Sequence, residues 1–141
     1  MAKKKSVGRP PKFKNKEEMQ EKIDNYFKEC EGEVLKNEDG SIFTDKNGMP
    51  VIVGARPLTM SGLANALGFS SRQSLLNYEG KKEFMDTIMR ARARVEQYTE
   101  ERLFDKNSAN GAKFSLANNF EGWKEKQEVE VTEHYKLEDL I

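Results

Sequence analysis

Apolar residues recur at helical spacing in several parts of the chain. The segment 16–30 places its apolar residues on one helical face, with acidic residues in the first turn and Gly32 at its end: Met19, Ile23, Tyr26, Phe27 and Cys30. The segment 81–104 predicts the longest helix, with an apolar stripe of Phe84, Ile88, Ala91, Val95 and Tyr98. Another short helix is expected around residues 112–118. Together these patterns predict a mainly α-helical fold.

Residues 33–54 show a different pattern. Short β-prone pieces at 33–35, 41–44 and 51–53 are separated by the reverse-turn sequences EDG and KNG. The pattern predicts a small β-hairpin insertion. We interpret it chiefly as a connector between helices, and a contact with DNA or another subunit is the alternative.

Residues 59–79 contain two short helical patterns separated by Gly68. Thr59 or Ser61 can cap the first helix, whose residues Leu63, Ala64 and Leu67 face inward, and Ser70 or Ser71 can cap the second. Two short helices with a glycine turn are typical of a helix-turn-helix. The second helix would present polar side chains of the types that reach bases and phosphates. An ordinary helical hairpin with a polar face is the alternative.

The charge is distributed unevenly, although 24 basic and 24 acidic residues balance overall. Residues 1–15 form a basic, flexible arm without periodic apolar positions. Its GRPP sequence is similar to the core of an AT-hook, in which Arg9 would enter the minor groove of A·T-rich DNA. A nonspecific phosphate-binding tail is the alternative. From residue 121 to the end, seven acids face three lysines, a net charge of −4.

The chain offers little for catalysis or metal binding. It has one cysteine, Cys30, and one histidine, His134, and it has no Walker-type phosphate loop. No apolar run approaches the roughly 20 residues that cross a bilayer. We therefore expect no catalytic residue, no metal, no cofactor and no membrane partner, and we expect the protein in the cytoplasm.

Self-association is expected from two features. The stripe of Phe84, Ile88, Val95 and Tyr98 has more apolar surface than one small core needs, and the alternating residues Val129 and Val131 indicate a strand without a mate in the chain. The predicted organisation is an arm (1–15), a helical DNA-binding domain (16–104) with its β-hairpin insertion (33–54), and a C-terminal segment (105–141) for oligomerisation and docking. The last residues, KLEDLI, are typical of a short docking helix.

Several segments together resemble a known family. They are GRPP, LANALGFSSRQSLLNYE, IMRARARVEQYTEERLF and, most specifically, NGAKFSLANNFEGWKEKQEVEV. Over most of residues 8–132 they resemble the small terminase subunits of tailed bacteriophages. The resemblance implies a non-enzymatic protein in the cytoplasm of the bacterial host. It would assemble into a ring, recognise double-stranded viral DNA for packaging, and regulate the large terminase subunit, an ATPase and nuclease.

The resemblance also implies which residues bind DNA. The helix-turn-helix would read DNA through Ser71, Arg72, Gln73 and Asn77, with Lys81 and Lys82 as phosphate contacts. One position departs from the common pattern: Ser74 stands where an apolar residue is usual and Leu75 follows it, which lengthens the turn by one residue.

Two other classes of function fit the same residues. A transcription regulator would bind a short operator as a dimer, and a structural adaptor would use its helical hairpins without contacting DNA. The number of subunits, the DNA sequence, the path of DNA around or through a ring, and the residues that touch the large subunit are left open by the sequence.

Overall fold

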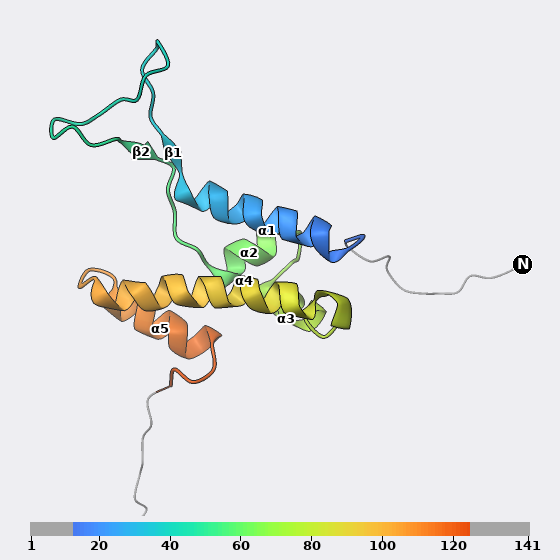
Figure 1. Ribbon diagram of the computed structural model, residues 1–141. Helices are drawn as coiled ribbons and strands as arrows, with labels where there is room; N and C mark the ends of the chain where they lie inside the picture. The colour runs from blue at the N-terminus through green and yellow to red at the C-terminus, as the bar shows by residue number, and fades with distance from the viewer. Residues whose placement is uncertain (1–12, 125–141) are drawn as a thin grey trace, which may run out of the picture.

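The computed structural model describes residues 13–124 and is mainly helical, which confirms the predicted fold class (Figure 1). The elements in chain order are α1 (Lys16–Glu31), β1 (Glu33–Val34), β2 (Ile52–Val53), α2 (Met60–Ala66), α3 (Arg72–Tyr78), α4 (Lys82–Glu101), the 3₁₀ turn η1 (Arg102–Phe104) and α5 (Ala109–Asn119). The long helix α4 runs through the middle, with α1 and α2 on one side and α5 on the other (Figure 1). Within residues 13–124 no helix is both long and apolar enough to cross a bilayer.

Helix α1 follows the sequence pattern closely. The Asn15 side chain caps it by accepting a hydrogen bond of 2.8 Å from the Glu18 N–H. All five residues of the predicted apolar face are buried. Gly32 ends the helix with a φ of 79°, and a Cβ at this position would lie 2.6 Å from the Val53 carbonyl oxygen. A glycine is therefore required here both by the backbone conformation and by the close approach of β2.

One hydrophobic core joins all the helices. Its members come from α1, α2, α3 and α4 and the segments between them, from Phe13 ahead of α1, from Leu116 in α5 and from Phe120 directly after α5. Two predicted boundaries are affected. Phe13 is only 2% exposed and lies in this core, and the predicted boundary of the arm at residue 15 stays a prediction. The division at residue 104 stays a prediction, with Leu116 and Phe120 beyond it packed in the common core.

The predicted surplus of apolar surface on α4 is not found. Phe84, Ile88 and Val95 are 3%, 0% and 1% exposed, because α1 and α5 pack against α4 and the Tyr78 ring of α3 contacts the Phe84 ring. These three side chains belong to the core of the single chain, and their predicted role in oligomerisation stays a prediction that this burial does not support. Tyr98 is half-buried, with the Arg102 guanidinium 4.4 Å from its ring centre. Val129 and Val131 lie outside the described residues.

The predicted β-hairpin insertion is present as a projection that we call the knob, residues 33–53 (Figure 1). β1 and β2 pair antiparallel, with Glu33 opposite Val53, and form its neck. The middle piece, 41–44, does not form a strand of its own. It is joined to its neighbours by the isolated bridges Lys36–Ile42 and Thr44–Pro50. The knob is therefore a folded unit with two tight loops instead of a plain connector.

Candidate nucleic-acid interface

Helices α2 and α3 are connected by a tight turn with a defined hydrogen-bond pattern. Thr59 caps α2 by accepting a hydrogen bond of 2.9 Å from the Gly62 N–H. At the other end of α2, Gly68 has a φ of 87° and donates to the Asn65 carbonyl, and Phe69 donates to the Ala64 carbonyl. These two bonds form a Schellman motif, which places a glycine at the left-handed position. The local sequence thus fixes the angle between the two helices.

Helix α3 has one packed face and one exposed face. Leu75 is fully buried, and Leu76 and Tyr78 are half-buried against the core. The buried residue at this position is Leu75 and not Ser74. This agrees with the expectation that the turn is one residue longer than in the common pattern. On the other face Arg72, Gln73 and Asn77 are exposed, and the Gln73 side-chain amide donates to the Asn77 Oδ1 at 3.0 Å. The structure therefore brings three of the predicted DNA-binding residues together on one surface.

Ser71 has a structural task at the start of the same helix. Its hydroxyl oxygen accepts a hydrogen bond of 3.1 Å from the Ser74 N–H and lies 3.1 Å from the Ser74 hydroxyl oxygen. The residue is exposed, and a serine oxygen can accept two hydrogen bonds and donate one. Its predicted contact with DNA stays a prediction, alongside its observed role as the helix cap.

The two predicted phosphate contacts follow α3 directly. Lys81 precedes α4 and Lys82 begins it, and both are exposed. The Lys81 ammonium lies 5.3 Å from the centre of the Tyr78 ring. Farther along α4, Arg92 forms a largely buried ion pair of 3.3 Å with Glu79, the residue that ends α3. This pair fixes the end of α3 to α4 and so holds both lysines beside the exposed face of α3.

Sequence reasoning missed the role of Phe13. Its ring lies 6.1–6.2 Å from the rings of Phe69, Tyr78 and Phe84, which belong to the turn, to α3 and to α4. A single aromatic residue among the basic residues that precede α1 was the available signal. Arg9 lies outside the described residues. It is joined to the anchored Phe13 by four residue steps, so any arrangement keeps its Cα within about 14 Å of that point.

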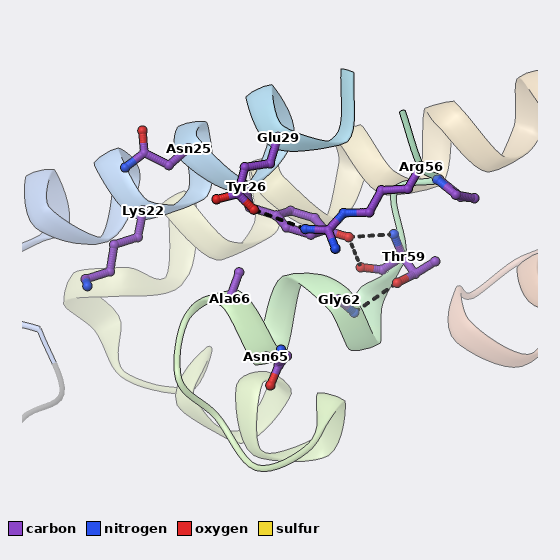
Figure 2. A pocket seen from close by; sticks show the side chains of 10 residues that line it. Lys22, Asn25, Tyr26, Glu29, Arg56, Thr59, Gly62, Asn65 and Ala66 are labelled. Carbon is purple, nitrogen blue, oxygen red and sulfur yellow. Dashed lines mark hydrogen bonds and ion pairs between the residues drawn. The ribbon is translucent and has the colours of Figure 1, made fainter. Parts of the chain in front are cut away.

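An open pocket of about 450 Å³ lies between α1 and α2, as Figure 2 shows. The Tyr26 hydroxyl accepts a hydrogen bond of 3.1 Å from the Thr59 N–H and donates one of 3.3 Å to the Thr59 carbonyl. Burial raises the pKa of Tyr26 above its usual value of about 10, more than the hydrogen bonds with Thr59 lower it. Arg56 and Glu29 form an ion pair of 3.0 Å at the pocket edge. The tyrosine therefore joins α1 to the start of α2, and the ion pair joins α1 to the segment ahead of α2.

The metal-ligating residue types are scattered in the described part of the chain. Residues 13–124 contain no cluster of three histidine, cysteine, aspartate or glutamate side chains that could hold a metal ion. Cys30 is buried, with its Sγ 3.7 Å from the Pro57 carbonyl oxygen. His134 and the predicted docking segment 136–141 lie outside the described residues.

Comparison with known proteins gives one informative result. Neither the curated proteins nor the solved structures contain a significant match. Residues 8–129, however, match a protein family, and this range includes the α2–α3 pair, the knob and α5. The description of that family names no enzyme class. Since the match spans most of the chain, the protein belongs to the DNA-packaging protein gp3 family of bacteriophages.

Proposed function

We propose that this protein is the small terminase subunit of a tailed bacteriophage. In this role it recognises viral DNA and regulates the large ATPase and nuclease subunit during packaging in the host cytoplasm, without catalysing a reaction itself. Membership of a DNA-packaging family supports the general role. The observation that carries the specific proposal is the exposed polar face of α3, bordered by Lys81 and Lys82.

The α2–α3 pair then acts as a helix-turn-helix, with α3 as the reading helix. Arg72 begins this helix and has no carboxylate partner among residues 13–124, so its guanidinium is available to a base edge or a phosphate. Gln73 and Asn77 supply amides, which pair with adenine in the major groove. Lys81 and Lys82 contact phosphates, which position the protein without reading sequence.

The basic arm adds a second contact. Its attachment at Phe13 lies against α3 itself, through the Tyr78 ring, so the arm starts beside the proposed reading helix. Arg9 and the neighbouring lysines can then follow the DNA from a fixed origin, with Arg9 in the minor groove.

Assembly and regulation involve the C-terminal part of the chain. We propose a ring in which the segment 105–141 contributes contacts between subunits, including Val129 and Val131, with Tyr98 at its border. The acidic end, with the docking segment 136–141, binds the large subunit. A ring multiplies weak contacts of single reading helices with the same DNA, which suits a non-catalytic recognition protein.

The test is DNA binding by fluorescence anisotropy at several salt concentrations, using the duplex that binds best in a selection from random sequences. We expect log affinity to fall with log salt by about 0.9 for each phosphate neutralised. Arg72→Ala should cost on the order of 1–3 kcal/mol on the selected duplex and less on unrelated DNA. Lys28→Ala is the matched control. It removes one positive charge at the far end of α1, and binding should stay the same.

Three results would contradict parts of this proposal. A salt-independent affinity would remove the electrostatic contact with DNA. Equal losses on all DNAs would reduce Arg72 to a phosphate contact, and tight binding of a palindrome by a dimer would favour a transcription regulator. Stimulation of the large subunit's ATPase by the full chain, lost on removal of residues 136–141, would support the regulatory part.

A further inference from the structure

The surface of the knob is unusually apolar. Seven large hydrophobic side chains in it are 37–61% exposed: Val34, Leu35, Ile42, Phe43, Met49, Ile52 and Val53. Figure 1 shows the knob extending from the end of α1, away from the helical body. Several exposed apolar side chains gathered on one projection are typical of a surface that another protein covers.

The knob is also a built structure, because it contains the same turn twice. In the sequence, LKNEDGSI is followed by FTDKNGMP with the same spacing of turn residues. Asp39 accepts hydrogen bonds from the Ser41 N–H and hydroxyl at 2.9 and 2.6 Å. Asp45 accepts from the N–H groups of Asn47 and Met49 at 2.8 and 3.0 Å. Both loops are therefore held by an aspartate at the turn.

Three backbone hydrogen bonds connect the repeats to each other. Leu35 N–H donates to the Val51 carbonyl at 2.7 Å, Phe43 to Leu35 at 2.9 Å, and Val51 to Phe43 at 3.3 Å. These residues are spaced eight apart and form a closed, three-membered arrangement. These hydrogen bonds fix the backbone of the knob, while its apolar side chains stay partly exposed.

The neck fixes the knob to the body. The Arg56 N–H donates to the Cys30 carbonyl at 2.9 Å, and the Arg56 side chain pairs with Glu29 of α1. At Gly32 a side chain would collide with Val53 and Ala55, so the two sides of the neck are in close contact. A knob held in this way can present its surface at a constant position, which lowers the entropy lost on docking.

A second exposed apolar surface lies at the far end of the chain. Phe104, in η1, is 87% exposed, and Phe114, in α5, is 72% exposed. Helix α5 is apolar on two faces, because Ala112 and Leu116 are buried on one and Phe114 points away on the other. A helix with apolar residues on both faces normally has neighbours on both sides. Among residues 13–124 nothing covers Phe114 on this outer face.

The two surfaces have opposite charge. The knob contains four acids, Glu33, Glu38, Asp39 and Asp45, against two lysines, a net charge of −2. Residues 102–119 contain Arg102, Lys106 and Lys113 against Asp105, a net charge of +2, with Arg102 also 4.0 Å from the Glu101 carboxylate. The negative knob is unsuited to DNA and to a second knob, whereas its charge and its apolar side chains both match the Phe104 and Phe114 surface.

We propose that the knob of one subunit docks on the Phe104 and Phe114 surface of the next copy of this chain. The inference rests on the self-association in the proposed function and specifies the surfaces that carry it. Because two different patches meet, the contact is head-to-tail, and repetition of such a contact closes a ring when the rotation between subunits permits. The proposed contact differs from the predicted one through Phe84, Ile88 and Val95, which the core of the single chain buries.

The test uses two variants of the full chain and their mixture. The knob variant is Ile42→Ser with Met49→Ser, and the acceptor variant is Phe104→Ser with Phe114→Ser. All four side chains are exposed, so both variants should fold, which circular dichroism checks. A third variant, Met85→Ser with Met89→Ser, is the matched control. It removes two exposed apolar side chains from α4, 45% and 51% exposed, outside both surfaces.

Analytical ultracentrifugation should show assemblies for the full chain and the control variant. Each docking variant alone should associate about tenfold more weakly or worse. The mixture should form a 1:1 dimer, because each pair retains one intact knob and one intact acceptor. This result identifies a head-to-tail contact, since two damaged copies of a self-complementary patch would not rescue each other.

Other outcomes overturn the proposal in distinguishable ways. If both docking variants assemble like the full chain, the docking surfaces are wrong and the proposed ring stands. If the full chain is monomeric at every concentration, the ring itself fails and docking fails with it. If the knob variant assembles normally but no longer stimulates the large subunit, the knob binds that subunit instead of a second copy.

Discussion

The Tyr26 hydroxyl forms two hydrogen bonds with the backbone of one residue, Thr59, accepting from its N–H and donating to its carbonyl. Thr59 is the cap of α2, and Tyr26 lies in the middle of α1. The hydroxyl of Tyr26 therefore connects α1 to the start of the α2–α3 pair. The orientation of the proposed reading helix depends on this connection.

Tyr26→Phe should lower the free energy of unfolding by about 1 kcal/mol, because the Thr59 N–H loses its acceptor in a partly buried place. Urea denaturation followed by circular dichroism measures the change. Tyr78→Phe is the matched control, because the Tyr78 hydroxyl is buried without a hydrogen-bond partner among residues 13–124. It should be neutral or stabilising, and a larger loss for Tyr78→Phe than for Tyr26→Phe would contradict both assignments.

The same hydroxyl predicts a dependence of stability on alkaline pH. The pKa of Tyr26 is raised in the folded chain, chiefly by burial, so the unfolded chain loses this proton first as pH rises past about 10. Its stabilising contribution is complete below that pH and is lost as pH rises through the folded-state pKa. The difference in stability between the natural chain and Tyr26→Phe should therefore shrink between about pH 8 and about pH 11. Urea midpoints at both values test this, and a constant difference would count against it.

Gly62→Ala should destabilise the protein by about 1–3 kcal/mol, because the added Cβ would overlap the Tyr26 hydroxyl and lie 2.8 Å from the Thr59 Oγ1. Gly111→Ala is the comparison within a helix. A Cβ at Gly111 meets no atom within 4 Å, and the residue lies in α5. That change should stabilise by about 0.5–1 kcal/mol. Thermal unfolding measures the change in stability of each variant. Equal changes for Gly62→Ala and Gly111→Ala would contradict the prediction.

Phe13→Ala should cost about 3–5 kcal/mol, since it removes a buried ring that contacts three other aromatic rings. Phe13→Leu should cost less, because it keeps apolar volume at the site. Chemical denaturation gives both values. A change below 1 kcal/mol for the alanine variant would show that residue 13 belongs to the arm and not to the core.

Helical periodicity predicted which faces of α1 and α4 are apolar, but it could not tell what covers them. Periodicity alone assigns the stripe of Phe84, Ile88 and Val95 to neighbouring subunits, because the residues that pack with it in the core, among them Phe13 and Leu116, lie far away in sequence. The candidate site was easier to predict. Arg72, Gln73 and Asn77 lie on one exposed face because short-range spacing alone determines it once Leu75 is buried.

The knob shows the opposite limit of sequence reasoning. The sequences EDG and KNG predict its two turns. In the structure the glycines at 40 and 48 have the positive φ values, 89° and 80°, that such turns need. Its exposed apolar side chains were not, because apolar residues in β-prone pieces are usually buried on one side of a sheet. Two-residue strands and a three-membered junction leave no such side.

Because Phe13 is buried in the core, the chain that leads back from it to Arg9 starts at a fixed point. In the proposed complex, four residue steps keep the Cα of Arg9 within about 14 Å of Phe13, so Arg9 would meet DNA bound by α3 at an effective concentration of about the millimolar range. The arm can then contribute strongly even if the isolated peptide binds DNA weakly. Its contribution to DNA affinity should depend on the number of residues between 9 and 13 more than on their identity. A longer connection would lower the effective concentration of Arg9 at the DNA.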